Sequence, residues 1–325
     1  MSTDNSPESR DPVARPPVAL IAGPTASGKS DCAVRLAQAI VAAGREAVVI
    51  NADSAQVYAD LRVLSARPSD AEMAGVPHRL FGAWDGASAC SAADWALAAA
   101  KLVAETHAQG GVPILVGGTG LYLRTLLDGI APVPAIDAAV RARVRGMAVA
   151  DAHAALVVAD PDRAAALAPA DAARVQRALE VAWSTGRTLG AWQARREGGI
   201  GDAVDLNSLV LLPERGWLYE RCDRRFSTML EHGAIDEVAA LLARGLDANL
   251  PVMRAIGVPQ IAGFLRGEWG RDEALRQGAQ ATRNYAKRQY TWFRHQPPAG
   301  WGRLEERYFD PEVHFATLLR DLRLT

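Results

Sequence analysis

The sequence predicts an α/β fold: a P-loop core on a parallel sheet, with a helical insertion domain and a helical C-terminal segment. Three observations predict it. A short apolar run leads into a glycine-rich loop at residues 18–30, apolar runs then alternate with helical patterns up to residue 127, and residues 137–196 contain no strand pattern. Strands that alternate with helices form right-handed βαβ units, in which the strands are parallel and helices cover both faces.

The N-terminal half supplies these strands and helices in turn. Residues 18–22 are an apolar run typical of a buried strand, and residues 30–43 carry apolar side chains at helical spacing before Gly44, a helix stop signal. The alternation continues with strands predicted at 47–50 and 113–116, a helix predicted at 94–108 and a helix that ends at Leu127.

A helical stretch then interrupts the alternation. Residues 137–196 are rich in Ala and Arg, and Asp151, Pro161 and Pro169 punctuate the helices within them. Gly198–Gly201 is a candidate hinge, a strand is predicted at 208–212, and the rest is helical. We therefore divide the chain into a disordered tail (1–16), a P-loop α/β core with C-terminal helices (17–135 and 205–316) and a helical insertion domain (136–204).

The charge balance excludes one class of nucleic-acid-binding protein. The chain of 325 residues has 36 Lys and Arg against 37 Asp and Glu, a net charge of −1. This excludes a uniformly basic coat but not a local basic patch, because a net charge hides its distribution. Only three of the basic residues are lysines, at Lys29, Lys101 and Lys287, so each raises the question of why Arg would not serve there.

The cysteines and the hydropathy pattern bear on the compartment. Cys32, Cys90 and Cys222 lie far apart without a CxxC pair, which fits neither a disulfide framework nor a zinc site. No apolar run reaches the ~18 residues of a membrane helix, and the N-terminus has no signal-peptide core. We expect a cytoplasmic protein with no membrane partner, and we take a monomer as the working expectation.

A phosphate-binding loop follows the first strand. Its sequence fits G-x-x-x-x-G-K-[ST], in which backbone N–H groups at a helix N-terminus cradle phosphate oxygens, a Lys adds a compact charge and a Ser or Thr hydroxyl binds Mg²⁺. The alternative is a tight glycine-rich turn without a ligand. The residues predicted to bind a diphosphate or a nucleotide are Gly23, Pro24, Thr25, Ala26, Ser27, Gly28, Lys29 and Ser30, with Ser30 as the metal ligand.

The loop does not identify the phosphate compound. ATPases and GTPases usually place a carboxylate at the end of a buried strand to hold Mg²⁺. The third strand here ends in Val116-Gly-Gly-Thr119, without a carboxylate, and the chain contains no Asn-Lys-x-Asp guanine-binding motif. Both absences disfavour a motor or a switch.

A carboxylate follows the second predicted strand. Asp53 begins the segment Asp-Ser-Ala-Gln-Val-Tyr58. The carboxyl ends of parallel strands open onto the ligand crevice, so Asp53 is expected on the same edge as the phosphate loop. There it can accept a proton or bind Mg²⁺ through water. The alternative is a turn or N-cap Asp, which Asp-Ser sequences commonly supply.

The motifs in this order resemble those of the bacterial tRNA dimethylallyltransferases (tRNA isopentenyltransferases), over residues 18–295. The matching segments are the loop 23–30, Asp53–Tyr58, Pro77–Leu80, Ser91–Asp94, Val116–Tyr122, Asp171–Glu180 and Thr282–Arg294. The sequence departs from the family pattern at three places. Leu64-Ser-Ala-Arg67-Pro68 stands for Gly-Thr-Ala-Lys-Pro, Cys90 for a common Tyr, and Val258-Pro259 for Tyr followed by a basic residue.

The resemblance implies a reaction and its residues. The family transfers a dimethylallyl group from its diphosphate to the exocyclic amine of the adenine immediately 3′ of the anticodon, in tRNAs that read codons beginning with U, giving isopentenyladenosine and diphosphate. It implies Mg²⁺ as cofactor and Asp53, Thr119 and Arg225 as catalytic residues. In this reading Asp53 accepts the proton of the amine, Thr119 lies in the reaction channel and Arg225 faces the diphosphate.

The resemblance also implies the tRNA contacts, on the anticodon stem-loop. The insertion and the C-terminal helix supply most of them; within the helix, Arg276, Arg283, Lys287 and Arg294 have spacings that place them on one face. The alternative for this helix is a solvated amphipathic surface with inward aromatics. The implied tRNA-binding residues are Asp53, Ser54, Ala55, Gln56, Thr119, Arg141, Ala173, Arg174, Val175, Gln176, Arg177, Arg254, Arg283 and Lys287.

Two other classes of protein use similar features. A small-molecule kinase shares the fold and the phosphate loop but needs ATP and no basic C-terminal face. A non-catalytic RNA-binding or nucleotide-switch protein has no need of the Asp53 carboxylate. Transfer of label from dimethylallyl diphosphate to tRNA separates the enzyme from both.

Overall fold

The computed structural model describes residues 15–306 and 311–322, so the predicted tail (1–16) lies almost wholly outside the described residues. The chain forms two compact units. We call Met1–Arg124 together with Gly201–Thr325 the α/β unit, and Thr125–Ile200 the helical unit. Each is described by itself.

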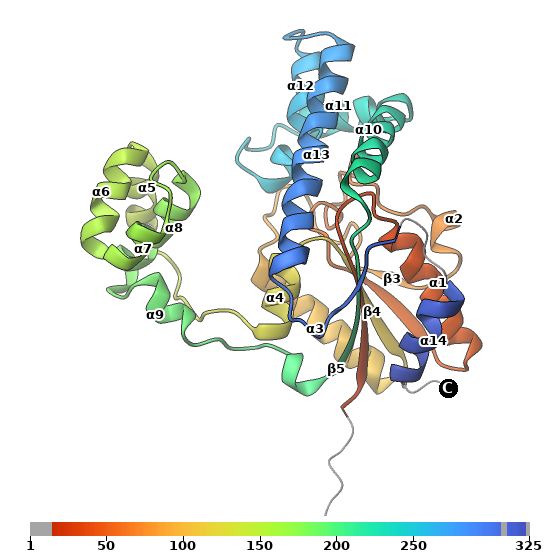
Figure 1. Cartoon of the computed structure of the whole chain (residues 1–325). Coiled ribbons are helices and arrows are strands. Elements are labelled where there is room, and N and C mark those ends of the chain that lie inside the picture. The colour runs from red at the N-terminus through yellow and green to blue at the C-terminus, as the bar shows by residue number, and fades with distance from the viewer. Residues whose placement is uncertain (1–14, 307–310, 323–325) are drawn as a thin grey trace, which may run out of the picture. The chain divides into compact units, whose positions relative to one another are not determined.

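A single parallel sheet organises the α/β unit (Figure 1). Within the described residues it has six strands in the order β3-β2-β4-β1-β5-β6, and every neighbouring pair is parallel. The fold class is therefore the predicted α/β one. The strands are β1 (Pro17–Ala22), β2 (Ala47–Asn51), β3 (His78–Arg79), β4 (Val112–Gly117), β5 (Asp205–Leu211) and β6 (Gly302–Leu304).

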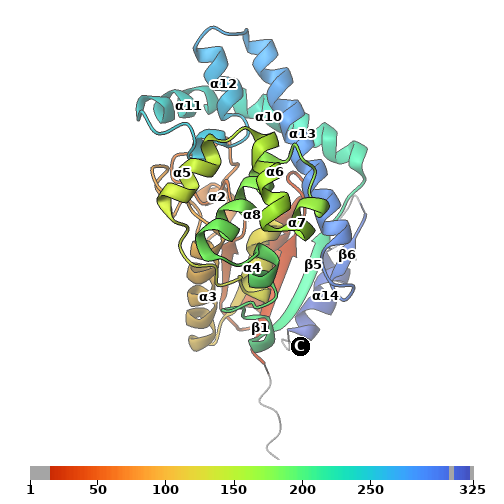
Figure 2. The same ribbon diagram turned by 90° about the vertical axis from the view of Figure 1, so that its left-hand side faces the viewer.

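Helices cover both faces of this sheet. Helices α1 and α14 lie on one face and α3 and α4 on the other, while α10 to α12 stand beyond the carboxyl ends of the strands (Figures 1 and 2). The helices are α1 (Lys29–Ala42), α2 (Asp70–Met73), α3 (Ala92–Ala108), α4 (Gly120–Asp128, which ends in the helical unit), α10 (Arg215–Glu231), α11 (Ala234–Ala243), α12 (Val258–Leu265), α13 (Arg271–His295) and α14 (Pro311–Asp321), with short 3₁₀ turns η1 (Gly201–Ala203) and η2 (Pro251–Arg254).

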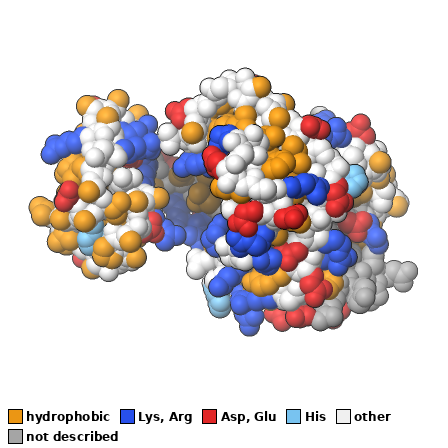
Figure 3. Space-filling view, turned by 90° about the horizontal axis from the view of Figure 1, so that it is seen from above, with side chains coloured by type: hydrophobic (Ala, Val, Ile, Leu, Met, Phe, Trp, Pro, Cys, Tyr) orange, Lys and Arg blue, Asp and Glu red, His pale blue; other side chains and the backbone are white. Residues whose placement is uncertain are grey.

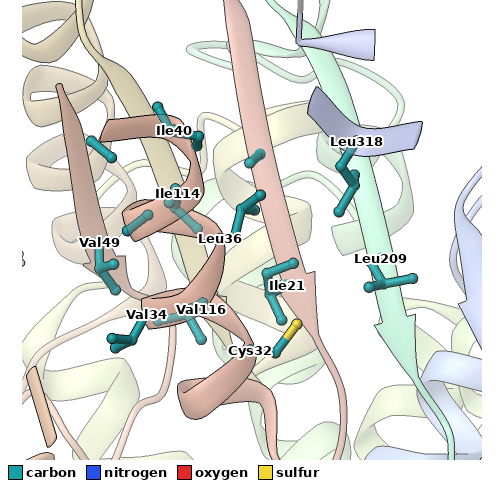
Figure 4. Close-up of a cluster of buried hydrophobic side chains, with 14 of the residues drawn as sticks. Ile21, Cys32, Val34, Leu36, Ile40, Val49, Ile114, Val116, Leu209 and Leu318 are labelled. Atoms are coloured by element: carbon teal, nitrogen blue, oxygen red, sulfur yellow. The ribbon is translucent and has the colours of Figure 1, made fainter. Parts of the chain in front are cut away.

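The core between α1 and the sheet fixes the loop that joins β1 to α1. Side chains spaced three and four residues apart on α1, among them Leu36 and Ile40, pack onto Ile21 and Ile114 of the central strands (Figure 4). All four are fully buried, and each such side chain contributes about 1.5–3 kcal/mol relative to an exposed one. The β1–α1 loop is thus held at both ends by rigid, buried elements.

The helical unit has a core of its own. Its core includes Leu156 and Leu179. Three of its helices, α5, α7 and α8, are capped by acidic side chains, since Asp137, Asp160 and Asp171 accept backbone N–H groups at a helix start. Asp151, predicted as a boundary, instead lies in the first turn of α6, where a carboxylate is favourable toward the helix dipole. The helices are α5 (Ala138–Gly146), α6 (Val149–Ala159), α7 (Pro161–Ala166), α8 (Ala172–Thr185) and α9 (Leu189–Gln193).

Two strands were not predicted. Strand β3 has two residues and β6 three, and they lie at the two edges of the sheet. Strands this short carry no period-2 pattern, so they form through pairing with β2 and β5 rather than through a local signal. They extend the sheet without changing its order at the centre.

The surface agrees with the near-zero net charge. On the face shown in Figure 3, acidic and basic side chains alternate over the α/β unit, and hydrophobic side chains reach the surface of the helical unit. In the latter, Val158 is 85% exposed. None of the helices in the described part of the chain is long and apolar enough to cross a membrane.

Candidate functional site

The loop between β1 and α1 has the backbone of an anion cradle. Gly23 has φ of 153° and Gly28 has φ of 94°. A side chain at Gly23 would lie 2.6 Å from the carbonyl oxygen of Leu211, so the residue must be glycine. Ala26 also has a left-handed φ of 64°. The turn delivers the chain to the first residue of α1, where the backbone N–H groups have no helical partner and can bind an anion.

Lys29 is buried at the start of α1. Its Nζ donates to the carbonyl oxygen of Pro24 at 3.3 Å, which keeps the ammonium folded over the loop. Burial lowers the pKa of Lys29 to about 8, and the carboxylate of Asp53 opposes that shift. The side chain of Lys29 is therefore a poorly solvated cation, and the negative charge of a bound phosphate group would offset its loss of solvation.

Arg225 brings a second cation to the same place from α10. Burial lowers the pKa of its guanidinium, Asp53 again opposes the shift, and the group remains charged because an arginine titrates far above neutral pH. Arg221, one turn earlier, donates from Nε to the carbonyl oxygen of Ala26 at 2.8 Å. Helix α10 therefore supplies a cation beside Lys29 and a second arginine that secures the loop.

A cavity of about 580 Å³ opens beside this loop, which we call the phosphate-loop cavity. Its lining is strongly charged and includes Ser30. Charged side chains that surround an anion site give the electrostatic stabilisation that phosphate chemistry needs. The charged residues that line it are Lys29, Asp31, Asp53, Glu72, Arg221, Arg224 and Arg225.

Asp53 follows β2 and is 7% exposed. Its Oδ1 accepts the backbone N–H of Ala55 at 2.9 Å. The fully buried Asn51 braces it from behind: Asn51 Oδ1 accepts the N–H of Asp53 at 2.9 Å, and Asn51 Nδ2 donates to the carbonyl oxygen of Asp53 at 3.0 Å. The carboxylate is thus held on a short, doubly bonded turn, and its position is fixed by a residue that sequence reasoning did not single out.

Thr119 lies opposite Asp53 in the turn that follows β4. Its Oγ1 accepts the backbone N–H of Ser54 at 2.9 Å and donates to Ser54 Oγ at 3.2 Å. Tyr285 of α13 joins the same network, because its hydroxyl hydrogen-bonds with the side chains of Thr119 and Ser54. Burial raises the pKa of Tyr285, so its hydroxyl stays protonated. Hydrogen bonds therefore join the turns after β2 and β4 at the carboxyl ends of these strands.

A second cavity of about 310 Å³ lies beside this network, and we call it the apolar cavity. Thr25, Asp53, Ser65 and Arg225 line both cavities, so they form a common wall. Aromatic and aliphatic side chains make most of the remaining lining, which suits a flat ring or a prenyl chain. These are Tyr58, Leu61, Leu64, Tyr122, Phe226, Met229, Pro251, Ile256 and Tyr285, with Cys90 and Cys222.

The predicted residues of the Asp53 segment divide between the cavities. Ser54 and Ala55 line the apolar cavity, whereas Gln56 lines the phosphate-loop cavity. The amide nitrogen of Gln56 already donates to the carbonyl oxygens of Ser65 and Ala66, at 3.0 and 2.9 Å. Both of its donors are thus engaged within the chain, and Gln56 Oε1 is the atom left to accept a hydrogen bond.

The basic residues of the C-terminal segment have different surroundings. Arg254 lines the apolar cavity, and Lys287 is exposed on α13. Arg283 forms a two-oxygen ion pair with Asp223 of α10, at 2.5 and 2.6 Å. Its charge is therefore partly neutralised, and it also ties α13 to α10. Arg288, which was not singled out as a contact residue, lines the apolar cavity and lies over the ring of Tyr285.

The predicted residues of the helical unit lie on α5 and α8. Arg141, Ala173, Arg174 and Arg177 are exposed, and Gln176 is partly buried. Val175 is fully buried in the core of this unit, so its side chain serves packing rather than the surface.

Among the described residues of this unit, two charged side chains are buried, those of Asp160 and Glu180. Glu180 pairs with Arg145 at 3.0 Å and lies 4.0 Å from Arg177. Its carboxylate therefore lies between Arg145 of α5 and Arg177 of α8.

Comparison with known proteins decides the family. The family model described as IPP transferase matches residues 56–296, most of the chain. The chain belongs to the IPP transferase family. Two relatives, both named tRNA dimethylallyltransferase, support this: one from Erythrobacter litoralis is 66% identical over 91% of this chain and 95% of its own length, and one from Novosphingobium aromaticivorans is 65% identical over 85% and 99%.

Solved structures of IPP transferase relatives share the fold. The tRNA isopentenylpyrophosphate transferase of Bacillus halodurans superposes with a TM-score of 0.68 and 32% identity, over 94% of this chain and 97% of that one. A eukaryotic dimethylallyltransferase, described as acting on tRNA, superposes with a TM-score of 0.73 and 27% identity, over 86% of this chain and 70% of that one. Both likenesses extend over the α/β core and beyond it.

Proposed function

We propose that this IPP transferase moves a dimethylallyl group from dimethylallyl diphosphate to the exocyclic amine of the adenine 3′ of the anticodon in tRNAs that read codons beginning with U. The observation that carries the proposal is the wall shared by the two cavities, in which Asp53 and Arg225 face both a charged site and an apolar one. The names of the relatives support the same reaction. We further propose that the enzyme acts in the cytoplasm, where its substrate tRNA is found.

The phosphate-loop cavity suits the diphosphate. As the bond from the prenyl C1 to oxygen breaks, negative charge builds up on the leaving diphosphate, and preorganised donors and cations stabilise it. Here these are the N–H groups at the start of α1, the buried Lys29 and Arg225. Poorly solvated cations interact with this charge more strongly than fully solvated ones do.

The residues at the loop fit a Mg²⁺ ion bound together with the diphosphate. Among the described residues no group of three or more His, Cys, Asp and Glu could hold a metal alone. Mg²⁺ does not require one, since it usually keeps several waters and takes one or two protein ligands besides substrate phosphates. Ser30 Oγ would be the protein ligand, and the ion would neutralise diphosphate charge.

The apolar cavity suits the two organic groups. An allylic carbon with cationic character must be kept from water, and the aromatic and aliphatic lining does this. The amine nitrogen of adenine forms the new bond to C1 as the C1–O bond breaks, and the nitrogen gives up one proton. Asp53, on the shared wall, accepts that proton as a general base. The adenine leaves its stack to reach this position.

The tRNA side of the proposal rests on exposed basic residues. Arg254 and Arg288 line the apolar cavity, and Lys287 lies on the outer surface of α13. Cations placed around the opening that receives a flipped base can bind the neighbouring phosphates. In the helical unit, Arg141, Arg174 and Arg177 are exposed side chains of the same kind.

One experiment tests the reaction. The protein is incubated with tRNA, Mg²⁺ and dimethylallyl diphosphate labelled in the prenyl group, and the tRNA is digested to nucleosides. We expect label in a prenylated adenosine that vanishes when the adenine 3′ of the anticodon is replaced by guanine. Label transferred instead from the γ-phosphate of ATP to a small molecule would support the kinase alternative, and absence of labelled adenosine would overturn the proposal.

A further inference from the structure

One side chain joins the two catalytic turns to α13. Gln289 is 5% exposed and lies in the C-terminal half of this helix. Its Oε1 accepts the backbone N–H of Thr25 at 2.8 Å, and its Nε2 donates to the carbonyl oxygen of Gly118 at 2.9 Å. A backbone N–H can only donate and a carbonyl oxygen can only accept, so only one orientation of the amide satisfies both partners.

Both partners adjoin residues that face the proposed chemistry. Thr25 belongs to the phosphate loop and lines both cavities. Gly118 directly precedes Thr119, whose hydroxyl is bonded to Ser54. The two backbone groups are therefore parts of two different walls of the site, and a single planar amide bridges them, beside the backbone hydrogen bond from the N–H of Gly23 to the carbonyl oxygen of Gly117.

The turn after β4 packs so closely against α13 that it has no room for side chains at two glycines. A Cβ at Gly118 would lie 2.3 Å from Gln289 Nε2 and 2.8 Å from the carbonyl oxygen of Gly23. A Cβ at Gly120 would lie 2.3 Å from the ring of Trp292, one turn further along α13. The glycines of this turn are thus needed so that α13 can approach the backbone closely, and the approach places Gln289 between the turn and the phosphate loop.

The hydrogen bond to Thr25 also decides which donors the phosphate loop offers. The N–H of Thr25 is occupied by Gln289, and the N–H of Ser27 donates to the carbonyl oxygen of Pro24 at 3.3 Å. The N–H groups left for an anion are those of Ala26 and Gly28 and those at the start of α1, beside Lys29. Gln289 thus keeps the N–H of Thr25 from the diphosphate.

We propose that Gln289 is a positioning residue for prenyl transfer. Its amide holds the phosphate loop at Thr25 and the turn at Gly118 in a fixed position relative to each other, and so places the diphosphate relative to Thr119 and Asp53. This inference rests on the proposed function. It assigns each hydrogen bond a separate effect. The bond to Thr25 governs binding of the diphosphate, and the bond to Gly118 governs the rate of transfer.

Two substitutions of Gln289 separate these effects. Gln289→Met keeps the length of the side chain and removes both hydrogen bonds, so we expect kcat to fall about 10- to 100-fold, as small misplacements of reacting groups do, and KM for dimethylallyl diphosphate to rise. Gln289→Glu keeps the acceptor for Thr25, so KM should stay near the wild-type value while kcat falls. Protonation of the new carboxyl group restores a donor to Gly118, so kcat relative to wild type at the same pH should recover as the pH is lowered.

The controls distinguish positioning from stability. Gln280→Met changes an exposed glutamine of the same helix. Leu318→Ala destabilises the core between α1 and the sheet. Both variants should keep the wild-type KM and kcat below their melting temperatures. The affinity for tRNA, measured by filter binding, should not change in either Gln289 variant.

Three results would overturn the inference in an active wild-type enzyme: Gln289→Met with kcat and KM within twofold of wild type, a loss that Leu318→Ala reproduces at equal stability, or a Gln289→Glu variant whose relative kcat does not vary with pH. An inactive wild-type enzyme would instead contradict the proposed function, so the two failures are distinguishable.

Discussion

The phosphate-loop cavity and the apolar cavity share a wall of Thr25, Asp53, Ser65 and Arg225, and their linings have no other described residue in common. The first takes its lining from the loop, α1, α10 and the segment 53–78, and is dominated by charge. The second takes its lining from aromatic and aliphatic residues of several loops and of α13. The difference matches the two halves of an allylic diphosphate, since an ionic leaving group and an apolar carbon skeleton need opposite surroundings.

This division teaches where each kind of residue can act. A cation beside the loop can affect the leaving group, and a hydroxyl or ring in the apolar cavity can affect the base or the prenyl group. Among the residues that line the cavities, only those of the shared wall face both. The comparison therefore predicts distinct effects for substitutions in the wall, in either cavity and outside both.

The largest effect is expected on the shared wall. Asp53→Asn keeps the size and the hydrogen bond to the Ala55 N–H but removes the base, so kcat should fall by about 10²–10⁴-fold. Binding of diphosphate at pH 7 should change little, because loss of a nearby negative charge and loss of support for the Lys29 ammonium act in opposite directions. Single-turnover kinetics together with calorimetric titration of diphosphate measure the two effects. A rate within threefold of wild type would remove Asp53 from the mechanism.

The second effect belongs to the phosphate-loop cavity alone. The pKa of Lys29 is about 8 because of burial, so the side chain is charged below that pH and increasingly neutral above it. The contribution of Lys29 to the affinity for diphosphate should therefore be constant below pH 8 and fall by up to about tenfold per pH unit above it. The binding reaction should take up a proton near pH 8.5, which calorimetry in buffers of different ionisation enthalpy detects. In Lys29→Met the affinity should be lower and the decline above pH 8 absent.

The parts of the site that could be predicted from the sequence are those that depend on interactions between residues close together in the chain. The phosphate loop and the position of Asp53 depend on residues next to them in the chain, so a local motif and the strand before it were enough. The same holds for the strands with buried, apolar runs. Strands β3 and β6, with two and three residues, depend on distant partners and left no local pattern.

The supporting residues could not be predicted for the same reason. Gln289 contacts Thr25 across 264 positions, and Arg283 meets Asp223 across 60. In the sequence, Gln289 was one polar residue among many on an amphipathic helix, and Arg283 was one of four cations on its exposed face. Only the packing of α13 against the turn after β4 separates the buried amide from the solvated side chains, and it shows that Arg283 is already paired.

The third effect belongs to the apolar cavity. Tyr285→Phe removes only the hydroxyl that bonds to Thr119 and Ser54. A hydrogen bond of this kind contributes about 0.5–1.5 kcal/mol, so kcat should fall about 2- to 12-fold while the affinity for diphosphate is unchanged. Tyr290→Phe is the matched control, because Tyr290 lies on the same helix and lines neither cavity. Equal losses in both variants would mean that the helix, and not the hydroxyl, carries the effect.

The smallest effect is expected outside both cavities, where Lys287 lies exposed on α13. If it binds a tRNA phosphate, Lys287→Gln should lower the slope of log affinity against log salt by about 0.7–0.9 and leave kcat at saturating tRNA unchanged. Arg283→Gln should lower the slope less, because Asp223 already pairs with that guanidinium. Lys101→Gln, on α3 and paired with Glu105, is the control and should leave the slope as it is. A steeper change for Arg283 than for Lys287 would mean that tRNA displaces Asp223, and the ion pair between α10 and α13 would then be a contact that opens when the substrate binds.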